Sequence, residues 1–294
     1  MTQAALPPLT GPAEVALPCQ DLQPTLDFFL NELGFRVEAI FPADAPAVAS
    51  LSGHGLHVRL APGGGDPGRL RIATIGGDGW PGRTLTAPNG TVIELVDPDP
   101  PVSLPDLAPA FTLCRASESP PSAAGRAGML YRDLIPGRLG GRYIASHISI
   151  PEGGPLSDWV HFHKIRFQMI FCRRGWVRVA YEDQGEPIVM HPGDFVLQPP
   201  RIRHRVLESS AGLEVVEIGC PALHETLADH AMTLPTGRTL PERDFGGQLF
   251  LFHVAADGAW TPCPEAGGFE QQATAMGHAT RGVAEVRPAA LRRR

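Results

Sequence analysis

Lysine is almost absent from this sequence, and several other common features are missing with it. Lys164 is the only lysine among 25 lysines and arginines, so chemistry that depends on a lysine amine has one candidate at most. No run of about 18 apolar residues occurs, which excludes a transmembrane helix. The five cysteines never form a C-x-x-C pair, a pattern that fits reduced thiols and argues against a disulfide framework or a zinc knuckle.

Charge and the first residues exclude two further classes of protein. The formal net charge of -6 gives no electrostatic reason to expect nucleic acid as a partner. Residues 1–8 lack the basic start and apolar stretch of a signal peptide, so we expect a cytoplasmic protein with no membrane partner. A chain of 294 residues with 43% hydrophobic residues has room for two domains, each with its own core.

The first domain is expected over residues 1–97. Leu22, Leu26, Phe29 and Leu33 recur at helical spacing, and Gly34 follows at the place where helices end. Strand-like stretches flank this helix at 15–18, 35–40, 47–52 and 56–60, which predicts a β-α-β-β-β unit. Further strands are predicted at 70–75, 83–87 and 91–96, with the turn Pro88-Asn89-Gly90 between the last two.

Three stretches of this domain resemble the glyoxalase/bleomycin-resistance (vicinal oxygen chelate) superfamily: 15–22 (VALPCQDL), 33–35 (LGF) and 87–97 (APNGTVIELVD). The resemblance implies paired β-α-β-β-β units around a metal or ligand cleft. Here the second unit has no room for its helix, so the module is degenerate. Glu14 stands at the usual first metal position, Glu94 matches the closing carboxylate, and His57 lies on a strand that often carries a ligand. These three residues form a second candidate site, with polar residues of a decayed cleft as the alternative.

The rest of the chain divides into a linker and a region of many strands. Residues 98–125 are rich in proline and serine, as linkers are. Short alternating strands follow between 141 and 218, separated by Gly and Pro turns, which favours a sandwich or barrel over 126–230. We expect the strands of 231–294 to complete or extend that barrel. If the strands exchange between the two chains of a dimer, they would do so in the barrel of the partner chain.

Two motifs in this region concentrate side chains that bind metals: 161–168 (HFHKIRFQ) and 193–204 (GDFVLQPPRIRH). His161 and His163 point to the same face of a strand because side chains alternate with period two. Gln168 can return to that face across a bend, and His204 comes from a later strand. Three imidazole nitrogens and one amide oxygen suit Fe, Mn, Ni, Cu or Zn.

These motifs resemble the two signature motifs of the cupin superfamily, over about residues 140–220. The resemblance implies an antiparallel β-barrel of the jelly-roll type with a metal in its mouth, bound by His161, His163, Gln168 and His204. Gln168 stands where most members have Glu, and Arg201 replaces the usual Gly of the second motif. Among the divalent transition metals, iron is the ion that we expect first at this site. The predicted fold class is therefore mainly β, with an N-terminal α+β module before the barrel.

Four further side chains are candidates for substrate binding. Tyr143 and His147 share one face of a strand, which can turn toward the metal, with a surface or core-edge histidine as the alternative for His147. Arg166 has the parity of Gln168 and can bind a carboxylate, with an exposed strand arginine as the alternative. Arg201 lies beside His204, where it can attract an anion.

Two functions from different classes fit these residues. The first is a metal-dependent enzyme, dioxygenase-like, that acts on a small oxygenated or aromatic carboxylic compound. The second is a non-catalytic protein that binds a metal or small ligand for sensing or storage. In either case we expect a small-molecule ligand and a homodimer, since symmetric dimers are the commonest oligomers.

Overall fold

The computed structural model describes residues 9–75, 79–115, 117 and 123–291. The chain divides into two compact units, Met1–Pro101 and Val102–Arg294. Each unit has its own buried core, and each is described by itself. None of the helices in the described ranges is long and apolar enough to cross a lipid bilayer.

The first unit follows the predicted order of one strand, a helix and three strands. The helix α1 (Leu22–Asn31) buries Leu22, Leu26 and Phe29 in the core of the unit, as their helical spacing predicts. The four strands form a sheet in the order β1-β4-β3-β2, in which β1 runs parallel to β4. Their bounds are β1 (Glu14–Pro18), β2 (Arg36–Phe41), β3 (Val48–Gly53) and β4 (Leu56–Ala61).

A smaller sheet completes this unit. It contains β5 (Arg69–Ala73), β6 (Thr84–Thr86) and β7 (Val92–Val96) in the order β5-β7-β6. No helix occurs between β5 and β7 in the part of this segment that the structure describes, in agreement with the short spacing in the sequence. Ile72, Ile93 and Leu95 of this sheet join the core that α1 covers.

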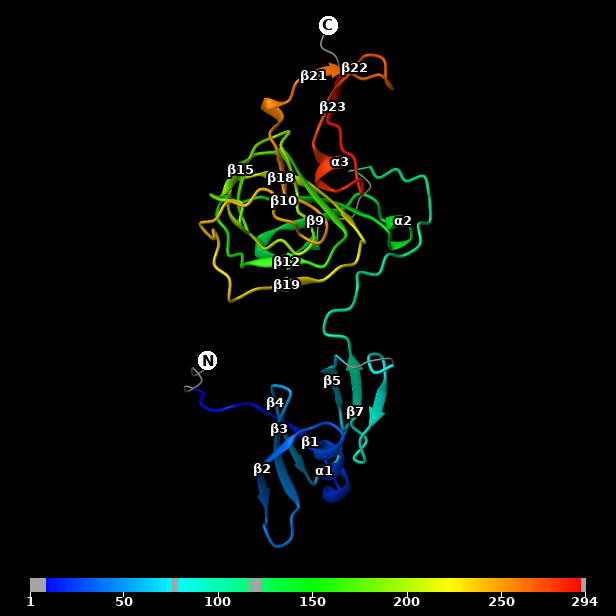
Figure 1. The fold of residues 1–294 in the computed structure, drawn as a ribbon, viewed down its shortest axis with the longest axis vertical. Coiled ribbons are helices and arrows are strands. Elements are labelled where there is room, and N and C mark those ends of the chain that lie inside the picture. The colour runs from blue at the N-terminus through cyan, green and yellow to red at the C-terminus, as the bar shows by residue number, and fades with distance from the viewer. Residues whose placement is uncertain (1–8, 76–78, 116, 118–122, 292–294) are drawn as a thin grey trace. The chain divides into compact units, whose positions relative to one another are not determined.

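The second unit is an antiparallel double sheet, which Figure 1 shows as the barrel of green and yellow strands. The seven-stranded sheet has the order β20-β16-β13-β18-β10-β9-β8. Its strands are β8 (Ala123–Ala124), β9 (Leu130–Asp133), β10 (Ile144–Ile150), β13 (Phe167–Arg174), β16 (Phe195–Leu197), β18 (Leu213–Cys220) and β20 (Leu251–His253).

The six-stranded sheet closes the other side of the barrel, in the order β15-β14-β17-β12-β19 with β11 also on β17. Its strands are β11 (Gly154–Pro155), β12 (His161–His163), β14 (Val177–Tyr181), β15 (Ile188–Met190), β17 (His204–Ser209) and β19 (Thr226–Ala228). Val179 and Tyr181 of this sheet share one apolar cluster with Ile148 and Val215 of the other. The mainly β fold with an antiparallel barrel is therefore confirmed.

The last part of the chain contributes to two places. β20 pairs with β16 and thereby extends the seven-stranded sheet. A separate three-stranded sheet contains β21 (Trp260–Pro262), β22 (Phe269–Gln272) and β23 (Ala289–Leu291). The short helix α3 (Met276–Ala279) packs Met276 beside Phe167 and Met169, on the opposite parity of β13 from Gln168. The remaining turns of helix are η1 (Arg126–Gly128), α2 (Arg138–Gly141) and η2 (Ala255–Asp257).

Candidate metal centre

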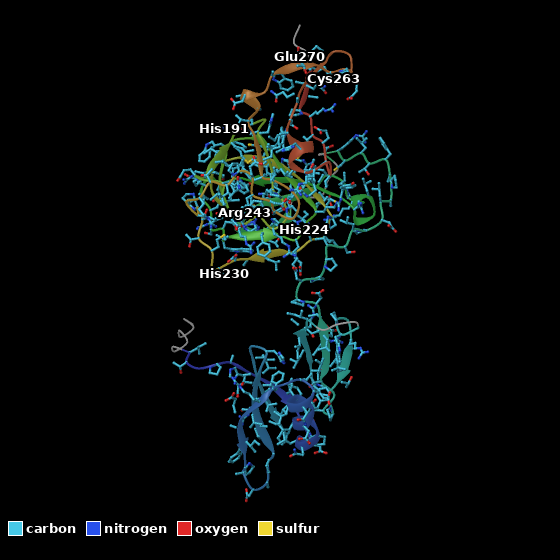
Figure 2. The ribbon with its side chains drawn as sticks, in the orientation of Figure 1. His191, His224, His230, Arg243, Cys263 and Glu270 are labelled. Carbon is cyan, nitrogen blue, oxygen red and sulfur yellow. The ribbon has the colours of Figure 1, made fainter. Side chains whose placement is uncertain are left out.

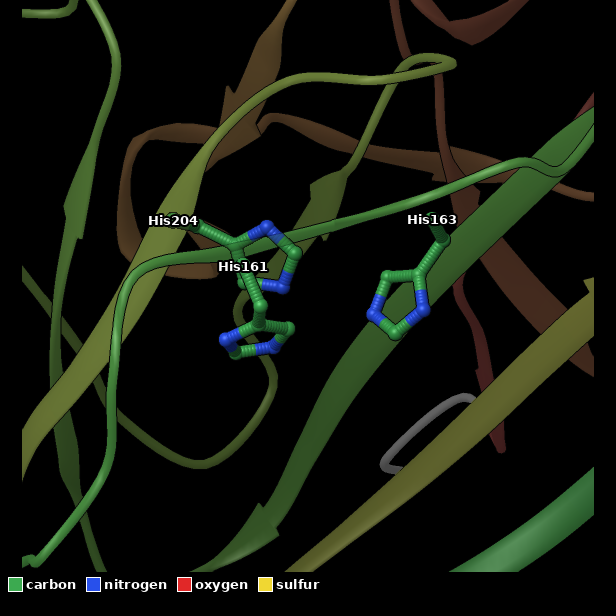
Figure 3. Close-up of side chains that lie close together, drawn as sticks. All are labelled: His161, His163 and His204. Carbon is green, nitrogen blue, oxygen red and sulfur yellow. The ribbon is translucent and has the colours of Figure 1, made fainter. Parts of the chain in front are cut away.

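Three buried histidines meet on the inner face of the six-stranded sheet. His161 and His163 come from β12, and His204 begins β17 directly opposite His161. The ring centroids are 4.2 Å apart for His161 and His204, and 5.3 Å for each of the other two pairs. Each residue offers one ring nitrogen, and these nitrogens lie within 4.8 Å of one another (Figure 3). Within the described ranges no other three His, Cys, Asp or Glu residues form such a group.

Local hydrogen bonds orient all three rings. In each ring Nδ1 is engaged at 2.8–3.0 Å, which leaves Nε2 with the ligand role. Nδ1 of His163 forms its hydrogen bond with a hydroxyl group, whereas Nδ1 of each of the other two rings donates to a backbone carbonyl. The partners of His161, His163 and His204 are Trp159 O, Thr226 Oγ1 and Ile202 O, respectively.

Burial keeps these imidazoles neutral. It lowers the pKa of His163 to about 2, with the neighbouring rings of His161 and His224 acting in the same direction. Burial likewise holds the pKa of His204 well below its usual range, and burial together with Arg126 lowers the pKa of His161. A metal binds neutral imidazole, so the three rings are already in the required state at neutral pH.

Gln168, the oxygen donor that the sequence predicts, is buried on β13. Its side chain is 2% exposed, and Nε2 donates a hydrogen bond of 2.5 Å to Glu217 Oε1 on the neighbouring strand β18. This bond fixes the orientation of the amide, and Oε1 is buried with no hydrogen-bond partner. A buried polar oxygen without a partner costs about 1–3 kcal/mol, which a metal ion would recover. The residues present therefore fit a divalent transition metal.

An arginine that the sequence analysis did not single out reaches the same centre. Arg126 Nη2 donates to His161 Nε2 at 2.6 Å, and Nη1 forms an ion pair with the buried carboxylate of Asp158. Arg126 lies 35 residues before His161, in η1 rather than on a barrel strand. No residue pattern marks such a contact in advance.

The centre opens on a cavity of about 270 Å³ inside the barrel. Its wall is mainly apolar and carries polar groups at the metal end, including Gln168, Glu217, Arg126 and His224. Apolar walls with a few converging polar groups are typical of small-molecule sites, and this volume is near the lower end of their range. Apolar lining comes from both sheets: Ile144, Ile148, Ile150, Ile170, Val177, Val179, Met190, Val206, Leu213 and Val215.

The structure does not bring Tyr143 and His147 to this cavity. Alternation along β10 turns Ile144, Ser146 and Ile148 inward, because the apolar interior favours isoleucine. His147 therefore lies on the other face, where its Nε2 donates to Glu214 Oε2 at 3.1 Å. Tyr143 precedes the strand and packs against the apolar cluster around Phe167.

The two predicted arginines also lie outside the cavity lining. β13 begins at Phe167, so the alternation that places Gln168 inward does not extend to Arg166, which is exposed. Arg201 has φ +65, and its backbone N–H donates to the carbonyl of His163 at 3.1 Å. This left-handed backbone explains why the resembling family usually has glycine there. Arg201 thus positions the chain beside the metal ligands.

The second candidate site of the first unit is not assembled. Glu14 and His57 are paired neighbours on β1 and β4, whereas Glu94 lies on β7 of the other sheet. The carboxylate of Glu94 is engaged by two arginines of β5: Arg69 contacts Oε1, and Arg71 Nε lies 3.4 Å from Oε2. Within the described ranges these three residues do not form a group whose ligand atoms lie within 4.8 Å of one another.

Comparison with known proteins finds similar solved structures but no matching family model and no matching curated sequence. An RmlC-like cupin from Shewanella frigidimarina is 19% identical over 38% of this chain and 93% of its own, with a TM-score of 0.32. The polyketide cyclase RemF from Streptomyces resistomycificus is 15% identical, over 44% and 91%, with a TM-score of 0.36. A mutant of the oxalate decarboxylase OxdC of Bacillus subtilis is 16% identical, over 45% and 35%, with a TM-score of 0.31. TM-scores this low carry no argument about the fold, so the evidence for the barrel is the strand pairing of this chain itself.

Proposed function

We propose that the second unit is a metal-dependent cupin enzyme, dioxygenase-like, that acts on a small oxygenated or aromatic carboxylic compound. One observation carries the proposal: three buried histidines form a metal-sized cluster, and two of them, His163 and His204, line an apolar cavity together with Gln168, whose amide oxygen has no hydrogen-bond partner. Iron is the first expectation for the ion, with Mn, Ni, Cu and Zn as alternatives.

The protein groups around the centre have separable roles. His161, His163, His204 and Gln168 would hold the ion, which supplies Lewis acidity and open positions for a substrate oxygen and O2. All four donors are neutral, so the donor set itself cancels none of the charge of a dication, which favours an anionic substrate; the carboxylate of Glu217 in the same wall is engaged by Gln168 Nε2. In the described part of the chain Arg126 is the one arginine in the cavity wall, where its guanidinium can receive a carboxylate.

The remaining wall limits what the substrate can be. Isoleucine and valine side chains from both sheets exclude water from most of the cavity, which favours a ring or short apolar body beside the carboxylate. Incorporation of both atoms of O2 draws four electrons from the substrate, so the reaction balances with no outside reductant. A compact, oxidisable carboxylic compound meets these requirements.

The alternative function is a non-catalytic protein that binds a metal or small ligand. The same cavity supports it, because an apolar pocket with a few polar groups can bind a small ligand without turning it over. The two functions differ in turnover. A sensor or storage protein binds its ligand with no O2 consumed, whereas the enzyme consumes O2 in proportion to substrate.

Two further expectations concern the rest of the molecule. We propose that the first unit is a degenerate vicinal-oxygen-chelate module that holds no metal, a proposal supported by its β-α-β-β-β order and by the ion pairs of Glu94. We also propose a cytoplasmic homodimer with a small-molecule ligand and no nucleic-acid or membrane partner. Light scattering of the purified chain tests the dimer, which a monomeric mass would contradict.

Oxygen consumption tests the enzymatic proposal. The protein is reconstituted with Fe(II) and screened in an oxygen electrode against catechols and keto acids. We expect O2 uptake that His161→Ala abolishes and that His191→Ala leaves unchanged. His191 (labelled in Figure 2) is a suitable control because it lies outside the metal centre and its side chain is 65% exposed. Uptake that survives His161→Ala would contradict the proposed site.

A further inference from the structure

Arg126 occupies the one nitrogen of His161 that a metal needs. His161 Nδ1 donates to Trp159 O at 2.8 Å, so Nε2 carries the ring's lone pair. Arg126 Nη2 lies 2.6 Å from that Nε2 and donates to it. An arginine guanidinium stays protonated in proteins, so this contact is a charge-assisted hydrogen bond onto a ligand atom.

The guanidinium is held in place by groups that are not metal ligands. Asp158 pairs with Nη1, and the carboxylate side chain is 1% exposed. The other carboxylate oxygen accepts the backbone N–H of Val206 at 3.0 Å, which fixes Asp158 to β17. The guanidinium carbon also lies 5.7 Å from the ring centroid of Trp159. Arg126 is thus anchored on two sides, with Nη2 free to exchange its acceptor.

We propose that Arg126 gates metal uptake by competing with the ion for the Nε2 lone pair of His161. When an ion binds, the hydrogen bond from Nη2 breaks and a metal–nitrogen bond forms, while Nη1 stays on Asp158. The guanidinium keeps its proton, so the exchange releases none at this contact. This inference rests on the proposed function only in that the same histidines bind the ion.

Two variants separate capping from simple charge repulsion. Arg126→Met removes both the cap and the positive charge, and it leaves Asp158 unpaired near the ion. Arg126→Lys keeps the charge and can remain on Asp158, but a single ammonium cannot bridge Asp158 and His161 as the two guanidinium nitrogens do. Arg178→Met is the matched control. Arg178 is exposed on β14, and it forms its ion pair with Glu208 of β17, away from the metal centre.

The experiment titrates metal-free full-length protein with Co²⁺ and follows the absorbance of the bound ion. We expect Arg126→Met and Arg126→Lys to bind Co²⁺ at least about tenfold more tightly than the wild type, and Arg178→Met to match it. In stopped flow, the second-order rate constant for Co²⁺ binding should be lower in the wild type than in either Arg126 variant, because a capped ring has no free lone pair for the ion and side-chain exchange is fast.

Each outcome decides the proposal. Equal affinities in the wild type and Arg126→Met, with Co²⁺ bound by both, would overturn the gate and leave the metal centre intact. Tighter binding in Arg126→Met alone would also overturn it, in favour of charge repulsion. Binding by the Arg126 variants but not by the wild type would support it, whereas no binding by any form would refute both the gate and the proposed function.

Discussion

Lowering the pH below 6.5 should destabilise the metal-free barrel, because histidines of the metal centre stay neutral in the fold. Burial lowers the pKa of His163 to about 2 and that of His204 well below its usual range. In the unfolded chain both rings take up a proton near pH 6.5. Below that pH the unfolded chain binds protons that the folded chain does not, so the free energy of unfolding falls as the pH falls.

The size of the effect follows from this difference in proton binding. One unit below the unfolded pKa, each neutral histidine lowers the free energy of unfolding by about 1.4 kcal/mol. His163 and His204 together therefore predict a loss of about 3 kcal/mol between pH 7.5 and 5.5, and His161 adds to it in the same direction. Asp183 and Glu214, whose pKa values are lowered from 3.8 and 4.5, act mainly at more acid pH.

Urea unfolding of the EDTA-treated chain, followed by tryptophan fluorescence at the two pH values, measures this loss. His163→Gln should reduce the loss by about 1.4 kcal/mol, whereas His191→Gln should leave it unchanged because His191 is largely exposed. The same pH dependence in the wild type and in His163→Gln would refute the reasoning that His163 stays neutral in the fold.

Three further predictions concern the donor set and the chain around it. Gln168→Leu removes the amide oxygen and should weaken Co²⁺ binding at least about tenfold in an absorbance titration; unchanged affinity would exclude Gln168 as a ligand. Arg201→Gly relieves a left-handed backbone and should raise the free energy of unfolding by about 1 kcal/mol in urea, and a decrease would contradict this account of the φ angle. Addition of Co²⁺ at 100 times its dissociation constant should stabilise the second unit by about 2.7 kcal/mol in the same assay, whereas no shift would mean that the folded state does not bind the ion preferentially.

The sequence contains enough to predict the fold class and the cluster of three histidines. Period-two alternation places His161 and His163 on one face whatever the rest of the barrel does. Helical spacing predicts α1 in the same way, because each pattern depends on neighbours within a few residues. The role of Gln168 as a ligand stays a prediction, which the titration of Gln168→Leu tests.

Contacts between distant segments could not be predicted in this way. The alternation around His147 allows either face to turn inward; β10 turns its isoleucines to the cavity and leaves His147 to pair with Glu214 of β18. The contact of Arg126 with His161 joins segments 35 residues apart, and only the folded barrel brings them together. Glu217 orients Gln168 from a strand that is adjacent in space but remote in sequence. Such partners depend on strand order, which local patterns do not determine.

Metal analysis of the purified chain beside a His161→Ala, His204→Ala double variant tests the central claim most directly. The account predicts close to one equivalent of a transition metal in the wild type after reconstitution, and loss of that metal in the double variant. His161 and His204 are paired residues of the neighbouring strands β12 and β17. Their removal leaves a single imidazole, which cannot form the site. Equal metal in the two proteins would place the ion elsewhere and contradict the account.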